Sequence, residues 1–374
     1  MIPRIRRIVL FGLSCTLLFS IGLVLADSGP NHEIKQALPI SLGTSGGNVN
    51  DITRRFCCSG TLGAVVADVN NSQFILSNNH VLADNDTATP GDDISQPGLA
   101  DVGCALTAAN SNTVAHFSTT KALGTANIDA ALAQVVPGAV SATGNILDVG
   151  IPSSTEATPA VGMGVAKSGR TTGLSCATIG SISTNVLVVY RRHCGLGKKL
   201  RIIYLNQVVV NGSTFSAAGD SGSLIVTQAE ARPVGLLFAG SSTTTIANPI
   251  SDVTKAFGVS VVGGADHAVT CPVATGVLAP TAARGPLADS TGRALLAKES
   301  HADRLMQDEA VIGVGVGSDP EDPSQAVVII YLQQGRIHEP IPAELDGVRT
   351  LVVRTDAFRA FDWNEPRAHP CRVQ

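Results

Sequence analysis

The chain has 374 residues, of which 44% are hydrophobic and 15% are charged, and its formal net charge is −4. This apolar content suffices for a buried core, and the lack of a long basic run excludes nucleic acid as an expected partner. Because 38 residues are glycine and 4% are aromatic, short strands and turns are favoured over a helical bundle.

Residues 1–26 have the pattern of a signal peptide. Three arginines in the first seven residues precede an apolar run from Ile8 to Leu25, and Ala26 follows as a small residue at the cleavage point. We expect cleavage after Ala26, export to the periplasm or the exterior, and no stable membrane insertion afterwards. The remainder would hold 23 basic and 30 acidic residues, a formal charge of −7. An uncleaved leader that anchors the protein is the alternative, because the run approaches the ~20 residues that a bilayer needs.

Seven cysteines follow the leader, and an odd number leaves at least one of them without an intramolecular partner. Export permits disulfides. Cys176 and Cys194 flank a strand-like stretch and are candidates for one bridge, and Cys57 or Cys58 is a candidate partner of Cys104, but the sequence alone does not determine the connectivity. No metal site is expected, because neither a Cys-x-x-Cys pair nor a nearby histidine pair occurs.

Short apolar runs dominate residues 44–262, which follow a polar N-terminal segment at residues 27–43. Asn, Asp, Gly and Ser separate these runs, a pattern that predicts an antiparallel sandwich or barrel. The clearest runs are Leu62–Ala67, Phe74–Leu76, Val186–Tyr190, Ile202–Leu205 and Val234–Phe238.

The composition changes after residue 262. Residues 263–290 hold three prolines among small residues and are predicted to be a linker. Residues 291–374 are predicted to form a small α+β module. It would hold a helix from Thr291 to about Asp308 and three strands. The helix's apolar positions would be Leu295, Leu296, Leu305 and Met306, and the strands would be Val311–Val316, Ala326–Tyr331 and Val348–Val353.

His80 closely follows the apolar run Phe74–Leu76, which is predicted to be a strand. The imidazole of His80 would therefore lie at the end of that strand, where the ring can reach a cleft. A surface histidine beside Asn78 and Asn79 is the simpler alternative. His80 is the first candidate for a catalytic group.

Asp129 lies among apolar and small residues in the segment 126–132, which predicts a buried carboxylate. Burial of a carboxylate is costly unless the group is hydrogen-bonded or paired, and a histidine Nδ1–H is a suitable partner. Other aspartates compete for this role, and Asp101 is the strongest rival.

Ser221 lies in the segment Ala218–Ser223, which a strand-like run follows. Gly219 allows a sharp turn, so that its N–H and that of Ser221 can point at one spot and form an oxyanion hole. Gly222 keeps the space beside the hydroxyl open. A glycine- and serine-rich loop without chemistry is the alternative. In the order His, Asp, Ser, the three segments supply a base, an orienting carboxylate and a nucleophile for peptide-bond hydrolysis through an acyl-enzyme.

These segments resemble the trypsin-like serine proteases of the chymotrypsin superfamily. Residues 161–180 are similar to a hairpin of the bacterial α-lytic protease and streptogrisin group, and to the narrow-leaf type of trypsin-like proteins. Residues 97–101 and 311–317 resemble the second group too. The resemblance covers most of residues 44–262. It implies a mainly β fold of two antiparallel six-stranded β-barrels with the active site between them, followed here by the α+β module.

The resemblance also implies roles. His80 would be the general base, Asp129 its orienting acid and Ser221 the nucleophile, with the Gly219 and Ser221 amides as oxyanion donors. A basic side chain of the hairpin would pair with Asp220: Lys167 is the first choice and Arg170 the second. Ser223 stands where the family usually has a glycine, and the cysteine that often follows the histidine is absent.

The same resemblance places Phe215, Phe238 and Gly240 in a specificity pocket. Residues 214–218 and 238–246 contain no acid, so a basic substrate side chain would lack a partner there. We therefore expect a protein or peptide substrate with an apolar or small residue before the scissile bond, and no cofactor. A catalytically silent protease-fold binding module and a protease that processes its own linker are the alternatives.

Overall fold

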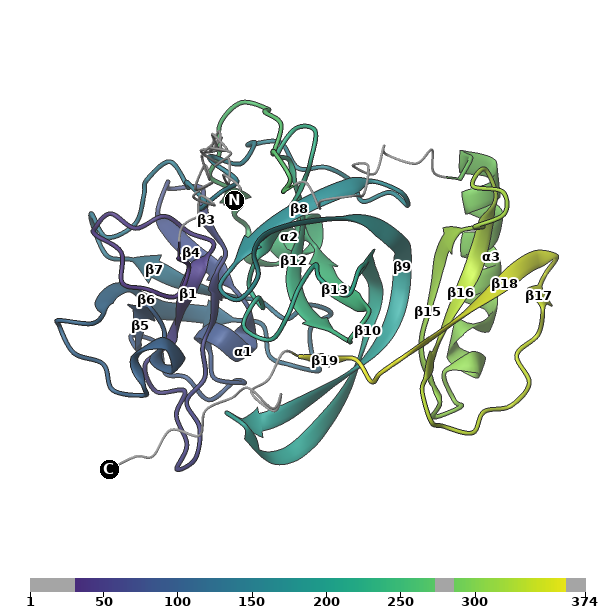
Figure 1. The fold of residues 1–374 in the computed structure, drawn as a ribbon, viewed down its shortest axis with the longest axis horizontal. Helices are drawn as coiled ribbons and strands as arrows, with labels where there is room; N and C mark the ends of the chain where they lie inside the picture. The colour runs from purple at the N-terminus through teal and green to yellow at the C-terminus, as the bar shows by residue number, and fades with distance from the viewer. Residues whose placement is uncertain (1–30, 273–285, 361–374) are drawn as a thin grey trace, which may run out of the picture.

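The computed structural model describes residues 31–272 and 286–360. Within these ranges the chain forms two β-barrels that lie side by side, and a small α+β module adjoins the second barrel (Figure 1). The predicted signal peptide, Cys371 and residues 273–285 of the predicted linker lie outside the described residues.

The first barrel is closed by antiparallel pairing. Its sheet has the order β14-β3-β4-β7-β6-β5-β1-β2, and β2 and β3 are two halves of one run that is broken at Gly63. The ring therefore has six strands, as expected, and β14 is added at the edge. The elements are β1 (Thr44–Asn48), β2 (Gly60–Leu62), β3 (Ala64–Ala67), β4 (Gln73–Ser77), β5 (Asp93–Gln96), β6 (Asn112–Thr120), β7 (Ala131–Val135) and β14 (Ser260–Val261), with the short helices α1 (Asn79–Leu82) and η1 (Leu99–Val102) between strands.

The second barrel is also a ring of six antiparallel strands, in the order β8-β9-β10-β13-β12-β11 and back to β8. The hairpin of β9 and β10 is much longer than the other strands and extends beyond the barrel (Figure 1). The elements are β8 (Gly164–Gly169), β9 (Gly173–His193), β10 (Leu196–Asn211), β11 (Leu224–Thr227), β12 (Pro233–Gly240), β13 (Thr244–Pro249) and the helix α2 (Ile250–Phe257).

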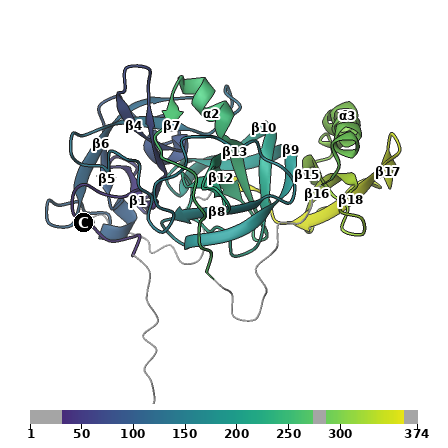
Figure 2. The ribbon, with the colours of Figure 1, turned by 90° about the horizontal axis from the view of Figure 1, so that it is seen from above.

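The C-terminal module continues the sheet of the second barrel. Its first strand pairs antiparallel with β9, and the next strands extend the sheet outward. Its helix lies on one face of these strands (Figure 2). The elements are α3 (Ala288–Leu305), β15 (Val311–Ser318), β16 (Ala326–Gln333), β17 (Glu344–Leu345), β18 (Val348–Thr355) and, back at the second barrel, β19 (Arg359–Ala360).

The helix α3 differs from its prediction in two ways. It begins at Ala288, inside the predicted linker, with Asp289 in the first turn, where a carboxylate interacts favourably with the helix dipole. The face that packs on β15 and β16 is built mainly from small residues, including Ala294 and Ala297. Leu296 is therefore turned away and is 71% exposed, against the prediction.

Three disulfides join described cysteines. Cys57 bonds Cys104, which is one of the two expected alternatives, while Cys58 bonds Cys194 and Cys176 bonds Cys271. The candidate Cys176–Cys194 bridge is wrong. Almost the whole of β9 separates these two residues at about 3.3 Å per residue, far more than the roughly 4–7 Å between the Cα atoms of a disulfide.

No described helix is long and apolar enough to span a bilayer.

Candidate active site

His80 lies on the short helix α1, which directly follows β4, and it does not lie on an open surface. Asn78 and Asn79, which suggested a solvated surface, are fully buried. The Asn78 side chain donates to the backbone oxygen of Asp129 at 2.7 Å, and the Asn79 side chain donates to that of Lys121 at 2.9 Å. These amides fix α1 against the segment before β7. The His80 side chain is 10% exposed.

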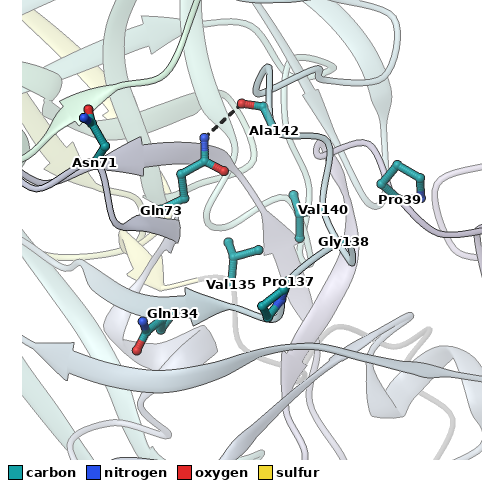
Figure 3. A pocket seen from close by; sticks show the side chains of 9 residues that line it. All are labelled: Pro39, Asn71, Gln73, Gln134, Val135, Pro137, Gly138, Val140 and Ala142. Atoms are coloured by element: carbon teal, nitrogen blue, oxygen red, sulfur yellow. Dashed lines mark hydrogen bonds between the residues drawn. The ribbon is translucent and has the colours of Figure 1, made fainter.

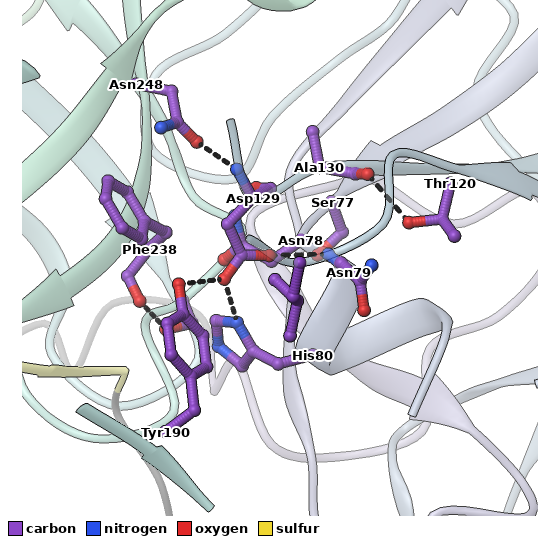
Figure 4. Close-up of polar contacts among 12 residues, drawn as sticks. Ser77, Asn78, Asn79, His80, Thr120, Asp129, Ala130, Tyr190, Phe238 and Asn248 are labelled. Atoms are coloured by element: carbon purple, nitrogen blue, oxygen red, sulfur yellow. Dashed lines mark hydrogen bonds and ion pairs between the residues drawn. The ribbon is translucent and has the colours of Figure 1, made fainter. Parts of the chain in front are cut away.

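Asp129 lies directly behind the His80 ring and is fully buried (Figure 4). Its Oδ2 lies 2.7 Å from His80 Nδ1, and its Oδ1 accepts a hydrogen bond from the Asn79 amide at 2.8 Å. Asn248 holds the Asp129 backbone by accepting from its amide at 2.9 Å. A carboxylate at Nδ1 favours the imidazole tautomer that carries its proton there, which leaves Nε2 as an acceptor.

Asp101, the rival acid, is engaged elsewhere. It forms an ion pair with the buried Arg170 side chain, whose Nε donates to Asp101 Oδ2 at 2.9 Å, and it also accepts from Ser45 Oγ. Although burial opposes the charge of Arg170, Asp101 raises the pKa of the guanidinium. Asp129 is therefore the acid beside His80.

Tyr190 of β9 is a further member of this site that the sequence analysis did not single out. Its hydroxyl donates to Asp129 Oδ2 at 2.8 Å and lies 2.9 Å from the hydroxyl of Tyr204. Burial, with the negative charge of Asp129, raises the pKa of Tyr190 well above its ordinary value, so the hydroxyl stays protonated. The sequence shows Tyr190 only as the end of an apolar run, because its partner lies 61 residues away.

Ser221 lies in a tight loop that packs against the first barrel. Gly219 and Gly222 have φ angles of 96° and 97°, which L side chains rarely adopt. A Cβ on Gly222 would lie 2.2 Å from the Thr61 oxygen, and one on Gly63 would lie 1.9 Å from the Gly222 oxygen. The glycines thus allow the two barrels to meet at the serine. There the backbone amide of Thr61 donates to the backbone oxygen of Ser221 at 2.8 Å.

His80 and Ser221 face one small hollow, of about 30 Å³, whose lining also includes Cys58, Tyr190 and Ala360. His80 Nε2 is buried there and has no hydrogen-bond partner among the described residues. Ser221 Oγ donates to the Phe238 oxygen at 3.2 Å instead. In this arrangement the hydroxyl is turned toward β12, and a change of its side-chain rotamer is needed before it can donate to the imidazole.

Two backbone amides of the loop donate no hydrogen bond to a described residue. The amides of Asp220, Gly222 and Ser223 all donate to backbone oxygens. Those of Gly219 and Ser221 have no acceptor within residues 31–272 and 286–360. They are the donors that the sequence predicts for an oxyanion hole.

Asp220 lies on the other side of the loop and is fully buried together with Lys167. Lys167 Nζ lies 3.3 Å from Asp220 Oδ2, and the carboxylate also accepts from the amides of Thr171 at 2.9 Å and Ala217 at 2.9 Å. Burial lowers the pKa of Lys167, and Asp220 opposes this shift. Lys167 is thus the partner of Asp220, and Arg170, the second choice, is paired with Asp101.

The residues proposed for the specificity pocket lie in three different environments. Phe215 is buried in the apolar interior of the second barrel, and Phe238 is buried against Tyr204 with a ring separation of 5.0 Å. Gly240 pairs with Arg359 of β19. The hollow beside Ser221 has a different lining, so this arrangement gives no support to a contact between Phe215 and a substrate side chain.

Two other features do not provide an alternative reaction centre. A hollow of about 520 Å³ on the first barrel is lined by residues without titratable side chains, among them Gln73, Gln134 and Val140 (Figure 3). Asp51, Cys58 and Cys194 lie close enough together to suggest a metal site. However, the two cysteines are joined in a disulfide and offer no thiolate.

No protein-family model matches this chain, and no curated protein matches it. The chain is similar to solved structures of bacterial serine proteases. A protease specific for glutamic acid is 19% identical, with 59% of this chain and 100% of that chain covered and a TM-score of 0.42. Protease A of Thermobifida fusca is 18% identical, with 60% and 99% covered and a TM-score of 0.40. An α-lytic protease homologue is 19% identical, with 55% and 94% covered and a TM-score of 0.39.

Proposed function

We propose that this chain is an exported serine endopeptidase that uses His80, Asp129 and Ser221. The observation that carries the proposal is the hydrogen bond of 2.7 Å between His80 Nδ1 and Asp129 Oδ2. It leaves His80 Nε2 without a hydrogen-bond partner among the described residues, in the same hollow as Ser221. A base, its orienting acid and a nucleophile meet there, as acyl transfer requires.

In the proposed reaction, Ser221 Oγ attacks the carbonyl carbon of the scissile bond while His80 Nε2 takes the hydroxyl proton. The amides of Gly219 and Ser221 bind the oxyanion, which contributes about 3–4 kcal/mol per donor in comparable sites. The C–N bond then breaks as His80 returns the proton to the amine, and water releases the acyl group by the reverse proton transfers. Asp129 stabilises the imidazolium, and Tyr190 and Asn79 hold the carboxylate in place.

Export and specificity are part of the proposal. Three disulfides between described cysteines suit an oxidising compartment, in keeping with the predicted leader. A preference for apolar or small residues before the scissile bond rests on the sequence alone, because residues 214–218 and 238–246 contain no acid.

A catalytically silent protease-fold module is the second candidate. It is favoured by the closed state of the site, because a hollow of about 30 Å³ has room for little more than a water molecule. It is also favoured by the Ser221 hydroxyl, which donates to Phe238.

Labelling with a fluorophosphonate separates the two candidates, since only an activated serine reacts rapidly. We expect the purified protein without residues 1–26 to be labelled at Ser221, with Ser221→Ala and His80→Ala unlabelled. An equal, slow rate for the wild type and His80→Ala would show that the serine is not activated and would favour the silent module. Cleavage of a peptide library then defines the residue preference, and a profile dominated by arginine would contradict the expected one.

A further inference from the structure

The strand β19 occupies an edge of the second barrel beside Ser221. On β12, residues Pro233–Leu236 pair with β11. Further along the strand, Ala239 and Gly240 pair antiparallel with Ala360 and Arg359 of β19. The chain reaches this edge by returning from β18 to the barrel (Figure 1).

The position of β19 is tied to the reacting groups. Phe238, the residue before Ala239, accepts the hydrogen bond from Ser221 Oγ. Ala360 lines the same hollow as His80 and Ser221 and is 2% exposed. Because Arg359 lies opposite Gly240 and Ala360 lies opposite Ala239, β19 runs toward the nucleophile as its residue numbers rise.

An extended peptide binds a protein readily by adding a strand to a free sheet edge, where its backbone supplies the hydrogen bonds. Without β19, the stretch Ala239–Gly240 would be such an edge, because its other side is already paired with β13. This edge leads directly to Ser221. With β19 in place, the edge is filled and the hollow at the nucleophile has about 30 Å³.

The protein holds β19 in place from both sides. Phe358 is fully buried and packs edge-on against Tyr331 of the module, with ring centroids 5.6 Å apart. The Val189 amide of β9 donates to the Phe358 oxygen at 3.0 Å. Thr355, at the end of β18, donates to Ser241 Oγ at 2.6 Å. The module thus presents a tethered strand, and tethering of this kind gives an effective concentration on the order of millimolar.

We propose that β19 is a built-in inhibitor, which occupies the cleft that binds the substrate's residues before the scissile bond. This inference rests on the proposed protease function and names the ligand class of the cleft: an extended peptide that pairs with Ala239 and Gly240. Such a peptide would carry a small residue where Ala360 now lies. The C-terminal module then has a role, which is to present the inhibitory strand.

Arg359 offers a matched pair of variants in the full chain. Arg359→Pro removes the backbone N–H and disfavours pairing, whereas Arg359→Ala keeps the N–H and trims only an exposed side chain. A chain that ends at Phe358 removes β19 and keeps the buried ring. Thermal unfolding confirms that each variant is folded.

We expect Arg359→Pro and the shortened chain to hydrolyse a quenched peptide library with a kcat/KM at least about tenfold higher than the wild type. This is the change expected from losing a pair of strand hydrogen bonds. Their rates of Ser221 labelling should rise as well, and Arg359→Ala should match the wild type. Equal kcat/KM and labelling rates in all four proteins, with Ser221 reactive, would overturn the inhibitory role and leave β19 as a structural strand. If no protein, including the shortened chain, reacts at Ser221, the proposed protease function itself fails.

Discussion

The hydroxyl of Tyr190 donates to Oδ2 of Asp129 at 2.8 Å, the same oxygen that lies 2.7 Å from His80 Nδ1. A residue on the long β9–β10 hairpin therefore supports the carboxylate of the proposed triad. The tip of this hairpin is tied to the first barrel by the Cys58–Cys194 disulfide. The site thus depends on a part of the chain that lies outside the three segments with recognisable motifs.

Tyr190→Phe should reduce catalysis without unfolding the protein. It removes one hydrogen bond to a buried carboxylate, and such bonds contribute about 1.5–3 kcal/mol. We expect kcat/KM to fall by about tenfold or more. Tyr204→Phe is the control, because its hydroxyl contacts Tyr190 and not Asp129, and it should have a smaller effect. Steady-state kinetics of the two variants provide the comparison, and an equal loss in both would contradict a special role for Tyr190.

The variants Asp129→Asn and Asp101→Asn should lose different properties, catalysis in the first and stability in the second. The first places an amide behind His80 and should lower kcat by roughly 10⁴-fold with little effect on folding. The second should keep most of the activity but lower the free energy of unfolding by about 3 kcal/mol, because the buried Arg170 loses the negative charge of its nearest carboxylate. Kinetics and urea unfolding on both variants test this, and loss of catalysis in Asp101→Asn alone would restore Asp101 as the acid.

Lys167→Ala should destabilise the loop of Ser221. Lys167 and Asp220 are both fully buried, and removing the lysine leaves the Asp220 carboxylate without an opposite charge. Breaking such a pair costs about 3–5 kcal/mol. Arg232→Ala, at a partly exposed ion pair, serves as the control and should cost much less. Urea unfolding measures both, and an unaffected Lys167→Ala would refute the supporting role of this lysine.

Reduction or removal of the Cys58–Cys194 disulfide should affect both stability and catalysis. It connects residues 136 positions apart, and loss of a long-range disulfide costs about 2–5 kcal/mol. Because Cys194 closely follows Tyr190, the double variant Cys58→Ser with Cys194→Ser should also lose activity. The matched double variant at Cys57 and Cys104 should lose stability and keep kcat closer to the wild type. Unfolding curves and kinetics below the unfolding transition separate the two effects.

Asp266 should make a pH-dependent contribution to stability. Its hydrogen bonds from Arg232 and Ser153 lower its pKa to about 2, below the 3.8 of an unperturbed aspartate. The folded state therefore binds fewer protons than the unfolded state between these values. Its contribution is present above about pH 3.8 and is lost as the pH falls through about 2. The urea midpoint of Asp266→Asn should be lower than that of the wild type at pH 5, and the gap should narrow toward pH 2.5. A constant gap would contradict this assignment.

The local sequence determined the parts of this protein that depend on neighbours along the chain. Short apolar runs with turn residues between them predicted an antiparallel sandwich or barrel, and the resemblance to trypsin-like serine proteases implied two six-stranded barrels. The glycines around Ser221, the strand before His80 and the apolar setting of Asp129 predicted where each group would lie. The signal peptide, with cleavage after Ala26, stays a prediction.

Only the tertiary structure decided which distant groups meet. The local sequence pattern does not predict four of these contacts. They are the pairings of Arg170 with Asp101, of Cys176 with Cys271, of Tyr190 with Asp129 and of β19 with β12. Barrel closure and the register of long strands set these contacts, and both depend on packing summed over the whole sheet. The sequence neighbours of a side chain indicate whether it is buried and which face of a strand it occupies. They do not indicate which distant residue lies opposite it in the folded protein.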